Sequence, residues 1–264
     1  RGLPGIRVLP GLFIKCDIRR QNTMVTKKRG GLWDTIKTLS YAVLIALFIR
    51  TFAFEPFNIP SGSMIPTLLV GDYLFVSKYS YGYSRHSLPL SLPLISGRVF
   101  TSVPARGDVA VFKLPKDNST DYIKRIVGLP GDKVQVRLGR LFVNGKIVPR
   151  RRLVKFPVRG PLGSTIGISQ YAETLPAGVS YRILERGDNF QLDNTSVYTV
   201  PPGHVFGMGD NRDDSQDSRV LSEVGYIPVE NLVGRAEFIF FSHDPAGNGW
   251  PLSVRWSRLF QAIR

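Results

Sequence analysis

The chain has 264 residues, enough for one large domain or two smaller ones, and a formal net charge of +15. Such a charge suits a nucleic acid, an anionic membrane surface or acidic partners, and does not choose among them. The single cysteine, Cys16, excludes an internal disulfide framework and a cysteine-rich metal site. Because 26 glycines and 19 prolines separate short, β-branched apolar runs, we expect a mostly β fold.

The first 31 residues form a basic segment that has neither helical nor strand periodicity. Met24 lies within it, and two interpretations stay open. Either the residues before Met24 do not belong to the native protein, or they form a disordered basic tail.

Residues 32–50 are predicted to form a transmembrane anchor. No charge interrupts the apolar run from Leu39 to Ile49, and extension back to Leu32 gives about the 18 residues that a spanning helix needs. A buried core helix and a cleaved secretory signal are the alternatives. Against cleavage, no small-x-small site follows Ile49.

The basic residues in front of this helix predict its orientation. Lys27, Lys28 and Arg29 precede the apolar run, so the positive-inside rule places residues 1–31 in the cytoplasm. Everything after the helix is then expected on the outer face, close to the bilayer.

A proline-bounded loop follows the helix and reads FNIPSGSMIPTLL from Phe57 to Leu69. Ser61 and Ser63 lie between Pro60 and Pro66, which leave the backbone few alternative shapes. A stiffened serine suits a nucleophile. The same composition is also ordinary for a loop.

Three β-strands are predicted around this loop, at 73–76, 109–114 and 122–127. In the third strand the period of two places Lys124 and Arg125 on opposite faces. A buried, unpaired lysine has a lowered pKa and can act as a general base. The alternative is an edge strand with both charges in water.

Residues 137–202 differ in composition and are predicted to form a smaller β subdomain inserted into the first. Asn144 and Gly145 indicate a hairpin turn. The basic stretch 150–155 is typical of a solvated surface, since no aromatic stacking pattern accompanies it. The larger β core would then comprise residues 51–136 and 203–264.

The stretch GHVFGMGDNRDDSQDSR, Gly203 to Arg219, combines a strand with a loop of alternating carboxylates and arginines. A calcium loop is one interpretation, but the EF-hand spacing fails. A scaffold of internal Asp–Arg pairs fits better, and it could hold a hydroxyl against a buried amine.

Four stretches in order, PSGSMIPTLL, RGDVAVFK, DYIKRIVGLPGD and GDNRDDSQDSR, resemble the sequence boxes of bacterial type I signal peptidase, the Ser-Lys dyad leader peptidase family. The resemblance covers most of the chain from about Leu32 and is weakest through the insert. Enteric members carry two anchors, whereas one is visible here. The family implies a coiled β-barrel catalytic core with an inserted β subdomain after the anchor.

The resemblance also implies residue roles. Ser63 is similar to the family's nucleophile, Lys124 to its general base, and Ser61 to the hydroxyl that joins the Ser63 amide in the oxyanion hole. The other roles are an orienting serine, Ser215; supporting residues in the same box, Asp217 and Arg219; an ion pair, Asp210 with Arg125; and shallow pockets for small side chains, lined by Phe57, Ile59, Leu68, Tyr122 and Ile123.

The activity implied is that of a membrane-bound serine endopeptidase. It removes N-terminal signal peptides from exported preproteins after Ala-x-Ala sites through an acyl-enzyme, from a single-pass position in the inner (plasma) membrane with the catalytic domain on the periplasmic face. The implied partners are preproteins and membrane lipid, with the secretion translocase as a candidate, and neither nucleic acid, cofactor nor metal is required.

Two other functions are left open. A self-cleaving Ser-Lys protease, resembling the SOS-repressor processing domain, would lack the anchor and carry a DNA-binding half. A non-catalytic membrane-anchored β module would tolerate the loss of Ser63 and Lys124.

Overall fold

The computed structural model describes residues 31–88, 95–159, 164–176, 178–247 and 253–264. The predicted basic segment, residues 1–31, therefore lies outside the described residues except for Gly31. The chain divides into two compact units, Arg1–Ala42 and Val43–Arg264. The strands all belong to the second unit.

Helix α1, Leu32–Phe52, ends two residues beyond the predicted anchor. At about 1.5 Å per residue its 21 residues extend about 30 Å, the thickness of a bilayer's hydrocarbon core. Among the described residues it is the one helix long and apolar enough to cross a membrane. None of its residues is buried, as a core helix would require, which leaves an anchor or a signal sequence by length and composition.

The last turn of α1 is tied to the β structure that follows. The Tyr83 hydroxyl donates to the Phe52 carbonyl at 2.7 Å, and the two rings are 5.8 Å apart. Glu55 pairs with Arg50 at 3.1 Å and with the buried Lys78 at 2.9 Å. The chain therefore leaves the helix directly into the strand that precedes the serine loop.

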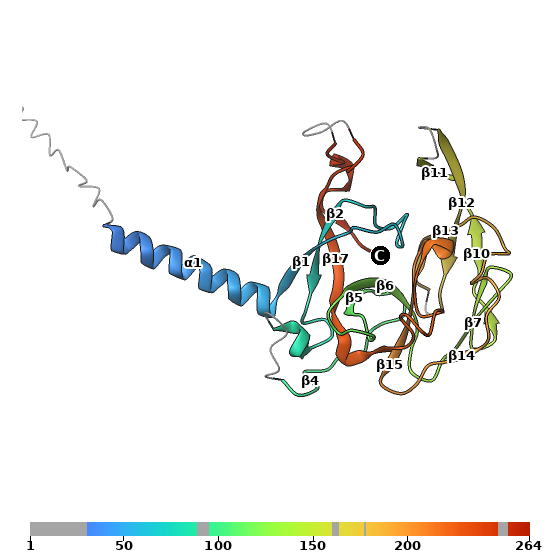
Figure 1. The fold of residues 1–264 in the computed structure, drawn as a ribbon, viewed down its shortest axis with the longest axis horizontal. Helices are drawn as coiled ribbons and strands as arrows, with labels where there is room; N and C mark the ends of the chain where they lie inside the picture. The colour runs from blue at the N-terminus through green and yellow to red at the C-terminus, as the bar shows by residue number, and fades with distance from the viewer. Residues whose placement is uncertain (1–30, 89–94, 160–163, 177, 248–252) are drawn as a thin grey trace, which may run out of the picture. The chain divides into compact units, whose positions relative to one another are not determined.

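The main sheet is antiparallel and curled, and it organises the second unit (Figure 1). Its strand order is β1 (Phe54–Asn58), β2 (Asp72–Ser77), β17 (Leu232–Ser242), β5 (Val109–Lys113), β6 (Asp121–Gly128), β15 (His204–Met208) and β16 (Ile227–Pro228), with β18 (Gln261–Ala262) beside β17. The end strands β1 and β16 do not pair with each other among the described strands, so the sheet is a half-barrel. The predicted mostly β fold is confirmed.

Bulges in strand β17 contribute to the curl of the main sheet. The pairing register of β17 shifts twice against β2 and once against β5, and such bulges bend a strand. A Cβ on Gly234 would lie 2.3 Å from the Ser77 carbonyl oxygen, so only glycine allows this approach of β17 to β2.

Two smaller sheets contain most of the strands within the predicted insert, 137–202, and one of them also includes β7 (Lys133–Arg137), which begins before that range. One has the order β14 (Tyr198–Thr199), β7, β8 (Arg140–Val143) and β9 (Lys146–Ile147); the other contains β10 (Arg150–Arg152), β12 (Thr165–Thr174) and β11 (Phe156–Arg159), with β13 (Ser180–Glu185) beside β12. Short elements complete the described chain: β3 (Tyr83–Ser84), β4 (Arg98–Val99), and 3₁₀ helices at Arg85–Ser87, Arg212–Asp214, Val229–Asn231 and Trp256–Arg258. Asn144 has the positive φ, 52°, that the predicted Asn-Gly turn requires.

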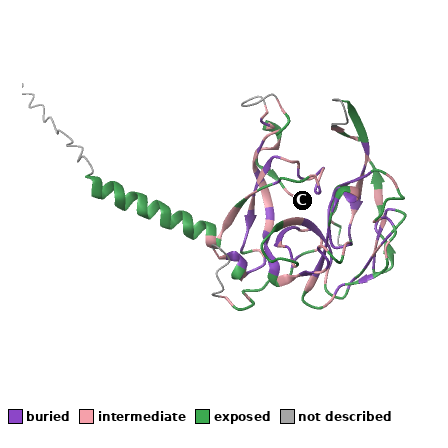
Figure 2. Cartoon of the chain, viewed as in Figure 1, coloured by how far each residue is buried: buried purple, intermediate pink, exposed green. Residues whose placement is uncertain are grey.

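The insert shares a hydrophobic core with the main sheet. Val127, Phe206 and Met208 of β6 and β15 pack in one cluster with Leu141 of β8 and Ile183 of β13. Buried residues are frequent along the strands of the curled sheet, whereas helix α1 contains none (Figure 2). Because the core is continuous, the smaller sheets and the main sheet stabilise each other.

Candidate active site

The loop that carries Ser63 joins β1 to β2 and is fastened at both ends. Ile59 N–H donates to the Asp72 carbonyl and Gly71 N–H donates to the Ile59 carbonyl, each at 2.9 Å. Met64 and Leu68 are fully buried in the core beneath the loop. Apolar side chains thus anchor the loop from below and leave Ser63 at the wall of a cavity.

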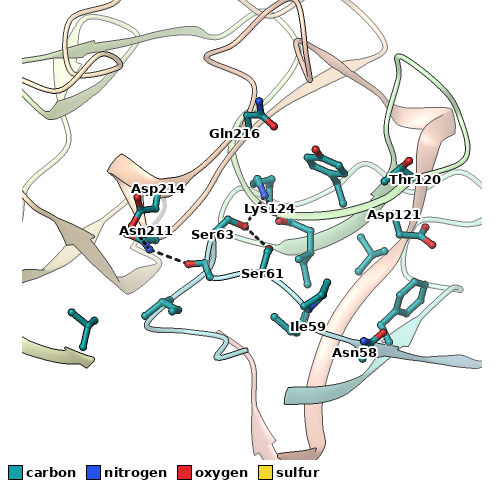
Figure 3. Close-up of a pocket in the computed structure, with 18 of the residues that line it drawn as sticks. Asn58, Ile59, Ser61, Ser63, Thr120, Asp121, Lys124, Asn211, Asp214 and Gln216 are labelled. Carbon is teal, nitrogen blue, oxygen red and sulfur yellow. Dashed lines mark hydrogen bonds between the residues drawn. The ribbon is translucent and has the colours of Figure 1, made fainter. Parts of the chain in front are cut away.

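Lys124 lies on β6 and points at Ser63 (Figure 3). Its Nζ is 2.9 Å from Ser63 Oγ and 2.9 Å from the Ile123 carbonyl oxygen. Strand β6 pairs with β5 on one side and with β15 on the other, so it is not an edge strand. The alternative in which Lys124 and Arg125 are both solvated is wrong, because their exposed fractions are 3% and 0%.

Burial lowers the pKa of Lys124 from 10.5 to about 8. The charges of Asp217 and Asp210 act in the opposite direction and that of Arg219 in the same direction. Among the described residues no carboxylate lies within ion-pair distance of Nζ, so desolvation of the ammonium prevails.

Ser61 contacts the side chain of Ser63, and Asn211 contacts the backbone. Ser61 Oγ is 3.4 Å from Ser63 Oγ. Asn211 approaches from the other side: its N–H donates to the Ser63 carbonyl and its Nδ2 to the Gly62 carbonyl, both at 3.0 Å (Figure 3). The sequence reasoning missed Asn211, since an asparagine within a loop of carboxylates carries no separate signal.

A cavity of about 710 Å³ opens beside Ser63. Phe57, Ile59, Tyr122 and Ile123 line it as the resemblance implies, whereas Leu68 is not among its lining residues. Val158 and Ile168 of the insert, with Arg186, Asp214 and Gln216, form further lining that the sequence reasoning did not find. His86, His204 and His243 do not line the cavity.

Comparison with known proteins identifies the chain. The profile of the family described as "Signal peptidase, peptidase S26" matches residues 32–241, more than half of the chain. The chain belongs to this signal peptidase family. It is therefore a peptidase.

Similar curated proteins agree. The signal peptidase I of Rickettsia conorii is 41% identical over 239 residues, which cover 87% of this chain and 85% of that protein. The signal peptidase I of Rickettsia rickettsii is 41% identical over 274 residues, 95% and 98% of the two chains. A solved signal peptidase I from Enterococcus faecalis covers 51% of this chain and 97% of its own at 22% identity with a TM-score of 0.30, too low to support an argument.

In this signal peptidase family member, the loop after β15 contributes to buried ion pairs, two of which involve Asp210 and Asp217. Arg125 donates to both oxygens of Asp210, at 2.8 and 2.7 Å, and Arg219 donates to both oxygens of Asp217 at 2.8 Å. The Thr67 hydroxyl also donates to Asp210, at 2.5 Å. The serine loop, β6 and the loop after β15 therefore meet at Asp210.

Ser215 lies close to the serine loop without bonding to the lysine. A Cβ on Gly209 would lie 2.2 Å from Ser215 Oγ and 2.5 Å from the Ser63 carbonyl oxygen, so glycine allows both to approach. Ser215 Oγ is buried and makes no hydrogen bond of standard geometry among the described residues, although its hydroxyl contributes to the lowered pKa of Asp217. Burial acts to raise the pKa of Asp217 and is the largest single cause, but the Arg219 charge and the hydrogen bonds from Arg219, Gly209 and Ser215 together outweigh it.

No group of three or more His, Cys, Asp or Glu within the described ranges could hold a metal ion.

Proposed function

We propose that this chain removes signal peptides from exported preproteins, with Ser63 as nucleophile and Lys124 as general base. The observation that carries the proposal is the buried amine 2.9 Å from the Ser63 hydroxyl, with a pKa lowered by burial to about 8, beside a cavity open to a peptide. A serine hydroxyl is a weak nucleophile until a neighbouring base takes its proton. Lys124 meets both requirements, position and proton affinity.

The reaction proceeds in two halves. Lys124 Nζ takes the proton of Ser63 Oγ as Oγ attacks the carbonyl carbon of the scissile bond. The resulting ammonium returns that proton to the leaving amine, which frees the mature protein and leaves the signal peptide as an ester on Ser63. Lys124 then takes a proton from water, the hydroxide attacks the ester, and the proton returns to Ser63 Oγ.

The oxyanion of each half is stabilised by the Ser63 N–H and the Ser61 hydroxyl. The peptide bond between Gly62 and Ser63 is trans and planar, so the Ser63 N–H points opposite to the Gly62 carbonyl. Asn211 holds that carbonyl at 3.0 Å and thereby fixes the direction of the N–H donor. A preorganised donor of this kind is worth about a hundredfold in rate or more.

The substrate is expected to bind as an added strand. Residues Asp121–Lys124 of β6 pair with β5 only, since β15 begins to pair at Arg125, so one edge faces the cavity. Main-chain bonds at such an edge hold an extended peptide, and pockets select its side chains. Phe57, Ile59, Tyr122 and Ile123 line the cavity with apolar groups and suit small residues at the first and third positions before the cut.

The location follows from helix α1. We propose that it is a single-pass anchor in the inner membrane with Lys27, Lys28 and Arg29 on the cytoplasmic side, so that the β unit works on the periplasmic face next to lipid. The secretion translocase is a candidate partner at that position.

Cleavage by the full chain in detergent tests the proposal. The substrate is a synthetic peptide with alanine at the first and third positions before the cut. Ser63→Ala and Lys124→Ala should each abolish cleavage above background, while Lys146→Ala, at an exposed lysine on β9, should cleave as the unchanged protein does. Equal cleavage by the unchanged protein and Ser63→Ala would eliminate the peptidase mechanism.

A further inference from the structure

The inserted subdomain has two buried polar side chains that contact the loop after β15. Glu173 of β12 and Tyr181 of β13 are a cross-strand pair, and their exposed fractions are 0% and 4%. The Tyr181 hydroxyl donates to Glu173 at 2.5 Å. A buried carboxylate is costly unless a cation and hydrogen-bond donors satisfy it.

The cation is Arg212, in the loop after β15. Arg212 donates to both oxygens of Glu173, once at 3.2 Å, and to the Tyr181 hydroxyl at 3.0 Å. Only 2% of Arg212 is exposed, and 39 residues of sequence separate it from Glu173. A two-pronged guanidinium–carboxylate pair fixes direction as well as distance.

Arg212 directly follows Asn211, which holds the carbonyls of Gly62 and Ser63. On the other flank, the Leu184 N–H of β13 donates to the Asp210 carbonyl at 2.8 Å. The insert therefore clamps residues 210–212 on both sides of Asn211. That segment in turn sets the peptide plane that carries the Ser63 N–H.

Tyr181 also reaches the second buried pair. The Arg125 guanidinium lies over its ring, 4.2 Å from the centre. Two buried ion pairs therefore lie close together, Glu173–Arg212 and Asp210–Arg125. The Tyr181 side chain contacts both arginines. The insert supplies the tyrosine and one of the acids.

We propose that Glu173 and Tyr181 of the insert are positioning residues for catalysis: through Arg212 they hold Asn211, and with it the Ser63 oxyanion donor, in the reactive geometry. This inference rests on the proposed function. Neither residue touches the substrate cavity, because neither lines it. Their loss is therefore expected to lower kcat and to leave KM unchanged.

The test separates positioning from folding by replacing the pair with apolar residues of similar volume. Glu173→Leu combined with Arg212→Met leaves no buried charge unpaired, so the fold should be retained. We expect the kcat of this double variant to fall about tenfold or more, because a displaced oxyanion donor stabilises the transition state less well. KM and the midpoint of the pH–rate profile should not change, since Asp217, Asp210 and Arg219 still surround Lys124.

A matched control is the pair Arg106 and Asp132, 2.7 Å apart and largely buried, with no bond to residues 210–219. Arg106→Met combined with Asp132→Leu should keep kcat within about twofold. If the Glu173/Arg212 variant is folded by circular dichroism and keeps the kcat of the unchanged protein, the inference is overturned. A loss that appears in KM, or equally in the control, overturns it as well.

Tyr181→Phe keeps the test decisive if the double variant does not fold. It removes only the hydroxyl shared by Glu173 and Arg212 and keeps the ring over Arg125. A kcat lowered about threefold or more at unchanged KM supports the inference, and unchanged kcat overturns it. Cleavage by the unchanged protein and none by Ser63→Ala must hold in the same assay, so failure of the proposed function would be recognised separately.

Discussion

Each face of strand β6 buries one basic residue, and the pKa values of the two side chains shift in opposite directions. Lys124 faces the cavity with a hydroxyl and a carbonyl as its hydrogen-bond partners. Arg125, the next residue, faces the loop after β15 and is held by both oxygens of Asp210. Equal burial of the two side chains therefore does not by itself decide the direction in which the pKa shifts.

The difference lies in the partner. Burial acts to lower the pKa of both groups; at Arg125 the neighbouring Asp210 outweighs burial and raises the pKa, whereas at Lys124 burial prevails and lowers the pKa to about 8. A contacting carboxylate favours the charged form of a buried basic side chain. Without one, burial favours the neutral form, which can accept a proton. The two residues can be told apart experimentally through activity and stability.

Replacing Lys124 by methionine should have the largest effect on rate. We expect turnover to fall at least about a thousandfold, because the proton acceptor is lost. The free energy of unfolding should rise by about 3 kcal/mol at pH 7, since the folded state no longer buries an ammonium whose pKa is 10.5 unfolded and about 8 folded. Peptide cleavage and chemical denaturation measure the two quantities.

The pH dependence of that gain gives the control. Between pH 8 and 10.5 the unfolded protein keeps the Lys124 proton and the folded protein loses it, so the unchanged protein should gain stability as pH rises. The methionine variant lacks this gain. A methionine variant that is less stable than the unchanged protein at pH 7 would contradict the assignment of Lys124 as a costly buried amine.

Replacing Arg125 by methionine should do the reverse. It leaves Asp210 buried without its cation, and we expect a loss of about 3–5 kcal/mol in the free energy of unfolding. Arg50→Met is the matched control, because Arg50 is exposed and its pair with Glu55 should contribute less than about 1 kcal/mol. Similar losses for the two variants would mean that the buried pair is not structural.

Removal of the Ser61 hydroxyl should lower kcat about a hundredfold through loss of one oxyanion donor. KM should stay nearly constant, because the donor acts mainly on charge that develops in the transition state. Steady-state kinetics of Ser61→Ala with the alanine-containing peptide measure both. A rise of KM at constant kcat would instead make Ser61 a substrate-binding residue.

The pH–rate profile should show the deprotonation of Lys124. The folded pKa is lowered to about 8, and only the neutral amine accepts the serine proton, so activity should rise with pH and level off above about pH 8. Below that midpoint the rate should fall about tenfold per pH unit. A midpoint below pH 7 would indicate a different base.

Ser215→Ala should have the smallest effect, a few-fold fall in turnover with the fold retained. Its buried hydroxyl makes no standard hydrogen bond within the described part of the chain, so its removal leaves no group unsatisfied. Ser218→Ala is the contrast, because Ser218 Oγ accepts from the Gly207 N–H at 3.0 Å and its loss should cost about 1–3 kcal/mol of stability. Unfolding of Ser215→Ala would make Ser215 structural.

Local pattern in the sequence was enough for part of this account. The apolar run predicted helix α1, the alternation in DYIKRIV predicted β6 with Lys124 and Arg125 on opposite faces, and Asn144-Gly145 predicted a hairpin. These features depend on residues a few positions apart, which the period of a helix or strand relates directly. The ordered boxes added the family.

Contacts between distant segments could not be read in this way. The alternation of β6 does not reveal which strands and loops pack around it, and therefore does not say that both charges are buried. Nothing near Glu173 in the sequence indicates that it binds Arg212. Leu68 belongs to the serine loop yet lies in the core, because the loop turns its apolar residues inward.

The sequence alone determined the types of reactive group and the strand and loop that carry them, since side-chain chemistry and local periodicity are properties of short stretches. Only the tertiary structure decided in which direction the pKa of each basic group shifts. Burial lowers the pKa of a lysine where no carboxylate contacts it, and at Lys124 the surrounding chain excludes water while Asp210 pairs with Arg125 instead.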